Sequence, residues 1–240
     1  MSELATPKLR RVGHKGADLI VPGNTLASFE AALAAGVDMI EFDVLIEQHG
    51  QRLLLAHDWI DAARRADAAT LEEGLDHLAA EAYAGVELDI DLKLPGYELR
   101  VVDALRERGM LERTLVSSQY RESLFLMRRA EPRLRLGWSV PKVRRDPFRH
   151  RVMLPAALAA VQAARAVMPG RAAAAIRDGW CDALMAHWRL VTPRLVRAIE
   201  RAGGELYAWT VDDVPLIRSL EALGVTGVIT NDPRLFTALG

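Results

Sequence analysis

The residues 13–45, GHKGADLIVPGNTLASFEAALAAGVDMIEFDVL, decide the fold because they hold most of a strand–helix–strand unit. Residues 24–35 place apolar side chains at helical spacing, and the short apolar run 39–44 that follows has the length of a strand. Another strand-like run, 10–14, lies before the helical segment and is joined to it by a loop. This order favours a parallel βαβ unit, in which the helix packs across two neighbouring strands.

The same alternation continues along most of the chain. Strand-like runs occur at 10–14, 39–44, 86–93, 114–118, 133–138, 183–188, 206–211 and 227–230. Helical spacing recurs at 24–35, 98–108, 122–130, 193–202 and 214–223. Eight such units predict an α/β fold of the closed (β/α)₈ TIM-barrel type, with an open doubly wound sheet as the competing arrangement. The run 53–58, LLLAHD, is interpreted as a hairpin extension after the second strand, and 1–240 as a single domain.

The segment 141–178, after the fifth strand, is too long for a simple connection and predicts a helical insertion. It opens with PKVRRDPFRHR, in which five basic side chains face one acidic residue, and continues as an alanine-rich apolar stretch. One interpretation is one or two alanine-rich surface helices with solvated arginines. The alternative is a lid, or an element in peripheral contact with a membrane, near the active site, because basic residues beside an apolar helix suit a lipid surface.

Composition limits the classes of function. The formal net charge of −1 provides no global field that would recruit nucleic acid. The single cysteine, Cys181, excludes an internal disulfide and favours a reducing compartment. The first residues lack the apolar core of a signal peptide, and no apolar run reaches the length of a membrane span. A cytoplasmic location is therefore expected, and the oligomeric state stays open.

Acidic residues share one face of two predicted strands. Side chains two positions apart on a strand point the same way, so Glu41 and Asp43 lie together, and Asp91 and Lys93 do the same. The apolar residues between them face the covering helices. Polar side chains inside a barrel are expected near its C-terminal rim, where active sites of this architecture lie.

Close, unpaired carboxylates repel one another and are costly to desolvate, and a bound cation removes both costs. Oxygen ligands suit Mg²⁺ or Ca²⁺, so Glu41, Asp43 and Asp91 are candidate ligands of a divalent cation. The competing interpretation is a buried salt bridge in which Lys93 or arginines neutralise the acids.

Two histidines follow strand-like runs at the same rim, His14 and His57. Imidazoles suit proton transfer near neutral pH, one taking a proton and the other giving one. Lys15 and Lys93 add cationic groups beside them, as an anionic ligand would need.

The motifs together resemble a known family. The stretch 13–45 and the runs LLLAHD, LDIDLK, LVSS, YAWTVDD and GVTGVITNDP occur in the order and spacing of the glycerophosphodiester phosphodiesterases. The resemblance runs from Gly13 to about Pro233. It implies a (β/α)₈ barrel that uses a divalent cation to hydrolyse glycerophosphodiesters to an alcohol and glycerol 3-phosphate.

The resemblance also implies roles for individual residues. Glu41, Asp43 and Asp91 would bind the cation, with Asp91 standing where the family usually has a glutamate. His14 and His57 would be the general base and acid, in an order that the resemblance does not assign.

Lys93 would contact the phosphate, and Trp209 would line the pocket, with core packing as its alternative role. Lys15 stands in place of the family's arginine, and Gly23 in place of a glutamate. Asn24 and the threonine after it are expected to cap the following helix.

Alternatives remain at the level of function. A related possibility is a lysophospholipase D-type hydrolase acting on lysophospholipids, which the apolar and basic segment 141–178 would favour. A different class is a non-catalytic barrel that binds a phosphate ligand. A glycosidase is disfavoured, because Glu41 and Asp43 on one strand cannot flank a glycosidic bond from opposite sides. The attacking group could be water or a neighbouring substrate hydroxyl that forms a cyclic phosphate.

Overall fold

The computed structural model describes residues 8–65, 68–141 and 154–239. Its strands are β1 (Arg10–Gly13), β2 (Met39–Ile46), β3 (Leu53–Leu55), β4 (Glu87–Leu92), β5 (Thr114–Ser118), β6 (Arg135–Val140), β7 (Ala183–His187), β8 (Glu205–Trp209) and β9 (Gly227–Thr230). Its helices are α1 (Leu26–Ala34), α2 (Trp59–Arg64), α3 (Leu71–Leu78), α4 (Glu98–Glu107), α5 (Arg121–Ala130), α6 (Leu154–Arg177), α7 (Pro193–Arg201) and α8 (Val214–Leu223).

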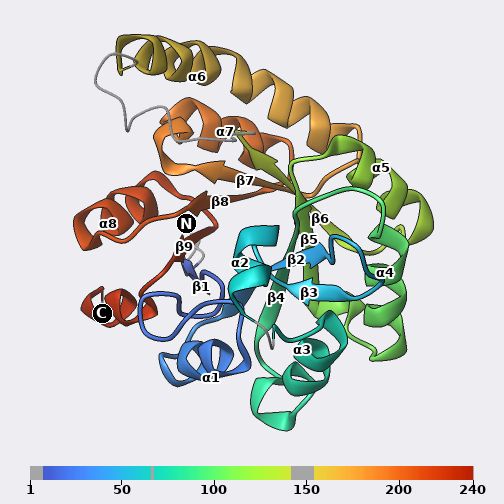
Figure 1. Ribbon diagram of the computed structural model, residues 1–240. Coiled ribbons are helices and arrows are strands. Elements are labelled where there is room, and N and C mark those ends of the chain that lie inside the picture. Colours follow the sequence, from blue (N-terminus) through green and yellow to red (C-terminus); the bar gives the residue numbers. More distant parts are fainter. Residues whose placement is uncertain (1–7, 66–67, 142–153, 240) are drawn as a thin grey trace, which may run out of the picture.

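The strands close into a barrel with helices around it (Figure 1). Strand β1 pairs in parallel with both β2 and β9, which joins the two ends of the sheet. The predicted (β/α)₈ barrel is therefore confirmed, and the open sheet is excluded. Strand β3 pairs antiparallel with β2, as expected for a hairpin extension.

The main core lies between the barrel and its helices. On β2, Ile40, Phe42 and Val44 are fully buried in this layer, and the ring of Phe42 lies 5.2 Å from that of Phe29 on α1. The alternation of side chains along β2 then turns Glu41 and Asp43 to the barrel interior. The predicted division of the strand into an apolar outer face and an acidic inner face is confirmed.

The start of helix α1 confirms the predicted cap at Thr25 but not the one at Asn24. Thr25 is its N-cap, since Thr25 Oγ1 accepts the backbone N–H of Ser28 while Ser28 Oγ accepts the N–H of Thr25. The expected capping role of Asn24 is wrong. Asn24 has a φ of 56°, and its side chain points to β2 instead.

Two helices between β3 and β4, α2 and α3, have no counterpart in the sequence prediction. Helix α3 begins with a capping box, in which Thr70 Oγ1 accepts the N–H of Glu73 and a Glu73 carboxylate oxygen accepts the N–H of Thr70. The sequence TLEE carried this signal.

Ionic contacts fill the N-terminal end of the barrel. Arg135 contacts Glu87 at 2.5 Å and Glu205 at 2.7 Å, while Arg10 contacts the same two carboxylates at 3.2 and 2.9 Å. The hydroxyl of Tyr207 lies 2.5 Å from Arg10 Nη1. Each arginine therefore bridges two strands that are not neighbours on the barrel wall, which ties the closed sheet together across its base.

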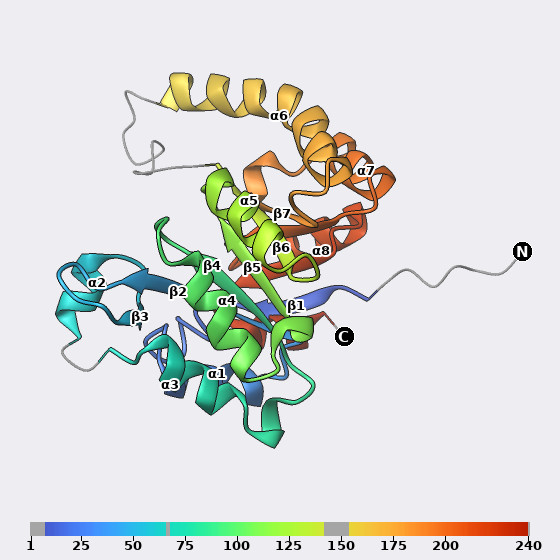
Figure 2. The same cartoon turned by 90° about the vertical axis from the view of Figure 1, so that its right-hand side faces the viewer.

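Helix α6 accounts for the described part of the predicted insertion. Of the segment 141–178, residues 142–153 lie outside the described residues, and 154–177 form one long helix. Its N-terminal part projects beyond the strands on the side of the barrel where α2 and β3 lie (Figure 2). Among the described residues, no helix is long and apolar enough to cross a membrane.

The ionic cluster at the base gives a prediction for stability. Burial would raise the pKa of Glu205, but Arg135 and Arg10 outweigh it and lower that pKa. A carboxylate with a lowered pKa stabilises the fold above its unfolded pKa near 4.5, and this contribution is lost as the pH falls through the folded value. We expect Glu205→Gln to lower the free energy of unfolding by about 1–3 kcal/mol at pH 7 and by less at pH 3.5.

Urea unfolding at both pH values measures this effect. Glu221→Gln, at an exposed position of α8, is the matched control and should leave the stability unchanged. An equal loss at the two pH values would contradict an ionic contribution from Glu205.

Candidate active site

Carboxylates from two neighbouring strands meet at the C-terminal end of the barrel. Glu41 and Asp43 lie on β2, and Asp91 on β4 stands opposite Asp43 in the strand register. One carboxylate oxygen from each of the three residues lies within 4.8 Å of the others. Asp89 stands opposite Glu41, one step deeper in the barrel, and is also buried. The structure thus brings together the three acids that the sequence predicted as a cluster.

Lysines neutralise part of this charge. Lys93 Nζ lies 2.5 Å from Asp43 Oδ1 and donates a hydrogen bond of the same length to Asp91 Oδ2. Lys15 Nζ lies 3.8 Å from Asp43 Oδ2. The salt bridge considered as an alternative to a metal site therefore exists. However, it leaves Glu41 without a lysine ammonium among the ion pairs of the described residues.

The pKa values of the acids reflect this uneven distribution of charge. Burial, followed by the Asp43 carboxylate, raises the pKa of Glu41 well above its usual range. Burial acts in the same direction on Asp43, but Lys93 and Lys15 outweigh it and lower the pKa of Asp43. Burial and then Asp91 raise the pKa of Asp89 to about 8. The lysines therefore favour the ionised form of Asp43, whereas burial and neighbouring carboxylates disfavour the ionised forms of Glu41 and Asp89.

The donor set fits a hard divalent cation. All three groups offer carboxylate oxygens, the ligands that Mg²⁺ and Ca²⁺ prefer. Asp91 Oδ1 is buried and has no hydrogen-bond partner among the described residues, so one lone pair there is available for a ligand bond. The buried triad is consistent with a metal site.

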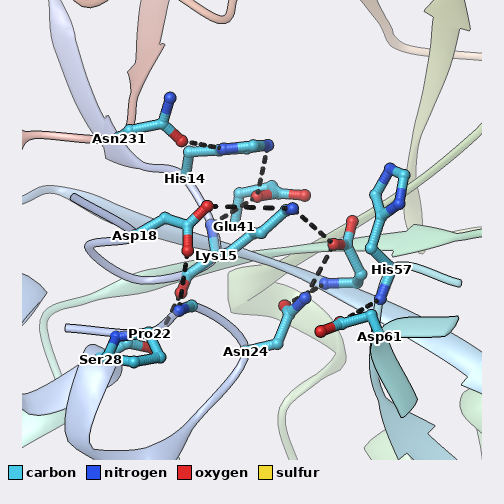
Figure 3. A network of polar contacts seen from close by, with 12 residues as sticks. His14, Lys15, Asp18, Pro22, Asn24, Ser28, Glu41, His57, Asp61 and Asn231 are labelled. Atoms are coloured by element: carbon cyan, nitrogen blue, oxygen red, sulfur yellow. Dashed lines mark hydrogen bonds and ion pairs between the residues drawn. The ribbon is translucent and has the colours of Figure 1, made fainter. Parts of the chain in front are cut away.

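Asn24 holds Asp43 from the loop between β1 and α1. Its Nδ2 donates to Asp43 Oδ2 at 2.8 Å, and its Oδ1 accepts the backbone N–H of Asp43 at 2.9 Å. The same loop places the backbone N–H of Lys15 on Glu41 Oε2 at 2.8 Å (Figure 3). Both Lys15 and Asn24 adopt the left-handed backbone conformation, with φ of 50° and 56°, which directs these donors at the acids.

His14 follows directly after β1 and lies beside the acids. Its Nδ1 is 2.5 Å from Asn231 Oδ1, and its Nε2 is 3.8 Å from Glu41 Oε2. Burial, more than any other influence, lowers the pKa of His14, which favours the neutral ring. The predicted proximity of this histidine to the acidic cluster is thereby observed.

His57 occupies the other side of the Glu41 carboxylate in Figure 3 and is half exposed. Its backbone N–H donates to Asp61 Oδ2 at 3.1 Å. Arg65 donates to the same carboxylate and also to the carbonyl oxygens of Gly23, Asn24 and Leu55. One guanidinium therefore connects the loop that carries His57 with the loop that carries Asn24.

The neighbourhood of Gly23 leaves no free space for a side chain at this position. Asp18 Oδ1 accepts the N–H of Gly23 at 2.8 Å, and Asp18 Oδ2 lies 4.0 Å from Lys15 Nζ. A Cβ atom at position 23 would come within 2.6 Å of Asp18 Oδ1 and 2.7 Å of the Lys15 side chain. The carboxylate of Asp18 fills the space that a side chain at position 23 would need.

A cavity of about 740 Å³ opens over these residues. Both histidines, Lys93 and Trp209 line it, whereas Lys15 is absent from the described residues of its wall. Trp209 Nε1 donates to the carbonyl oxygen of Met185 at 2.8 Å, so the indole is held in place and also borders the cavity. The apolar part of the wall includes five residues of α6: Ala156, Ala157, Ala160, Val161 and Ala164.

The fold agrees with comparisons to known proteins. A profile of the glycerophosphoryl diester phosphodiesterase family matches residues 14–58 and 61–235. The chain belongs to this family. The match covers the acids, both histidines and Trp209, and by homology it makes the chain a glycerophosphodiester phosphodiesterase.

Individual members of the family are distant in sequence. A glycerophosphodiester phosphodiesterase of Caldanaerobacter subterraneus is 23% identical over 93% of this chain and 94% of the relative. One from Bacillus subtilis is 24% identical over 97% of this chain and 87% of the relative. An Oleispira antarctica phosphodiesterase, solved in complex with the product sn-glycerol-3-phosphate, superposes with a TM-score of 0.71 at 19% identity, covering 96% of this chain and 97% of the other.

The contact between Asn24 and Asp43 gives a prediction for metal binding. Groups that orient a ligating carboxylate typically contribute 10–100-fold to metal affinity. We expect Asn24→Gly, which keeps the left-handed backbone without strain, to weaken Mg²⁺ or Ca²⁺ binding by about that factor. Titration calorimetry of the purified protein measures it.

Asn24→Ala separates the two effects of this residue. It deletes the same amide but adds backbone strain, so its metal affinity should match that of Asn24→Gly while its melting temperature falls further. Metal affinity equal to that of the unmodified protein in both variants would show that Asn24 does not support the site.

Proposed function

We propose that this protein hydrolyses glycerophosphodiesters to an alcohol and glycerol 3-phosphate, by metal-dependent catalysis with His14 and His57 as the proton-transferring groups. The observation that carries the proposal is the placement of both imidazoles on one cavity with Glu41 and Asp91, which form an acidic triad with Asp43 behind them. A noncatalytic phosphate-binding barrel would have no need of this costly combination.

The triad would hold Mg²⁺ or Ca²⁺, and the bound cation would neutralise charge that develops on the nonbridging oxygens of the phosphate. Among the described residues of the cavity wall, Lys93 is the lysine whose ammonium group a phosphodiester would reach. Lys15 was predicted to bind substrate. We favour a role in balancing the charge of Asp43, because Lys15 is not among the described lining residues and its Nζ lies 3.8 Å from Asp43 Oδ2. Trp209 borders the substrate as a rigid aromatic surface.

The histidines divide the proton transfers. One takes the proton of the attacking oxygen, and the other gives a proton to the leaving alkoxide as its bond to phosphorus breaks. The attacker is water or a neighbouring hydroxyl of the substrate. A cytoplasmic location, as the single cysteine favours, belongs to the same proposal.

Loss of the metal and loss of a histidine test this function. We expect EDTA to abolish hydrolysis of glycerophosphocholine and Mg²⁺ or Ca²⁺ to restore it. His57→Ala should lower kcat by about 10²–10⁴-fold, because general acid–base catalysis has that magnitude. His77→Ala, at a position remote from the cavity lining, is the control. Activity that survives both EDTA and His57→Ala would rule out the proposal.

A second candidate, hydrolysis of lysophospholipids with release of the head group, is favoured by the apolar cavity wall. The α6 residues of that wall offer no polar partner to a glycerol or choline group, and they suit an acyl chain. Exposed Leu158 on the same helix would allow peripheral contact with a lipid surface.

Filling the apolar wall distinguishes the two substrates. We expect Ala160→Trp to lower the activity on lysophosphatidylcholine at least about tenfold, since the indole occupies space that an acyl chain would need. Hydrolysis of glycerophosphocholine should change little. Ala163→Trp, exposed on the same helix but outside the cavity lining, is the matched control.

Two outcomes would contradict the lysophospholipid candidate. One is equal sensitivity of both substrates to Ala160→Trp. The other is a protein that cleaves only the water-soluble diester and does not bind liposomes.

A further inference from the structure

A chain of hydrogen bonds links His14 to a carboxylate on the loop after β8. Asn231 follows β9, and its Nδ2 donates to Asp212 Oδ2 at 2.6 Å. The other carboxylate oxygen, Asp212 Oδ1, accepts the backbone N–H of Asn231 at 2.8 Å and the hydroxyl of Thr230 at 2.9 Å. On its other side, Asn231 Oδ1 lies 2.5 Å from His14 Nδ1.

The carboxylate determines which way the amide of Asn231 points. A carboxylate only accepts hydrogen bonds, so the NH₂ group of Asn231 must face Asp212. The carbonyl oxygen of the amide then faces His14, and this oxygen carries no proton. The proton shared by the two side chains therefore belongs to Nδ1 of His14.

The contact with Asn231 therefore selects the tautomer of the neutral His14 ring that carries its proton on Nδ1. Only the neutral imidazole can act as a base, and with Nδ1 protonated its free lone pair is on Nε2. That nitrogen is on the side of Glu41, 3.8 Å from its Oε2. The only acceptor of the imidazole is thus directed at the acidic cluster.

We propose that Asp212 is a positioning residue that sets the tautomer of His14 through Asn231, so that His14 Nε2 accepts the proton and His57 donates one. The assignment of acid and base rests on the proposed function. In this arrangement Nε2 takes the proton of the attacking oxygen. His57, half exposed on the other side of the site, then protonates the oxygen that leaves phosphorus.

Asp212→Asn should invert the tautomer. The oxygen of the new amide stays with its two donors, the N–H of Asn231 and the hydroxyl of Thr230, so its NH₂ group faces Asn231. Two NH₂ groups cannot face each other, and Asn231 must rotate by half a turn. Its NH₂ then points at His14 Nδ1, which becomes the acceptor and moves the ring proton to Nε2.

Imidazole nitrogen chemical shifts measure this change directly. The experiment uses the full chain labelled with ¹⁵N-histidine in the presence of Mg²⁺, with the His14 signals assigned by their loss in His14→Gln. We expect protonated Nδ1 in the unmodified protein and protonated Nε2 in Asp212→Asn. With glycerophosphocholine, kcat should fall about 10²-fold or more in Asp212→Asn while KM stays within a few-fold.

Exchanging the residues at positions 212 and 231 should restore the tautomer and the activity. In the double variant Asp212→Asn with Asn231→Asp, the new amide at 212 donates to the carboxylate at 231, which accepts the proton of His14 Nδ1. We expect the original tautomer and most of kcat to return. A residue that merely stabilised the loop would not be rescued by exchanging the two groups.

Asp213→Asn is the matched control. Asp213 Oδ1 accepts the N–H of Leu216 at the start of α8, and asparagine can replace it there, so tautomer and kcat should not change. Protonated Nδ1 in Asp212→Asn, or an unrestored tautomer in the double variant, would overturn the inference. An unmodified protein without diesterase activity would refute the proposed function instead, because the chemical shifts report the tautomer without catalysis.

Discussion

The burial of three carboxylates whose oxygens lie within 4.8 Å of one another is the constraint on which the rest of this structure depends. Such groups are stable side by side only when positive charge and hydrogen-bond donors surround them. The barrel supplies Lys93 from the same strand as Asp91, and the β1–α1 loop supplies the amide of Asn24 and a backbone N–H. The rim of the barrel thus gives Asp43 and Asp91 a lysine ammonium and gives Glu41 a backbone N–H.

That support requires backbone conformations that are unfavourable by themselves. Lys15 and Asn24 are both left-handed, at an intrinsic cost of about 1 kcal/mol or more for a residue with a side chain. The loop is held from several directions, because the carbonyl oxygen of Lys15 accepts the N–H of Asn24 and the hydroxyl of Ser28, while Arg65 donates to the carbonyl oxygen of Asn24. Contacts made elsewhere in the fold thus maintain the strained geometry where the acids need it.

The sequence predicted the features that follow from periodicity. Alternation along β2 and β4 was sufficient to predict that Glu41, Asp43 and Asp91 face the same side. The strand–helix order favoured the barrel, and the pairing of β1 with β2 and β9 excludes the open sheet. Sequence patterns could not predict contacts that depend on the backbone angle of a single residue. Asn24 and Thr25 are both good helix caps, and only the left-handed φ of Asn24 turns its amide to Asp43. The partnership of Asn231 with His14 spans 217 positions and follows from closure of the barrel rather than from local pattern.

The crowded surroundings of Gly23 also bear on how this site can change. Asp18 and Lys15 occupy the volume that any side chain at position 23 would enter, so these three positions form one unit in which the effect of each substitution depends on the other two. Gly23→Glu by itself would meet a clash with Asp18 and Lys15 and a like charge at Asp18. A side chain can therefore enter position 23 only when both Asp18 and Lys15 give way, so tolerance to substitution at this edge of the site is shared among three positions.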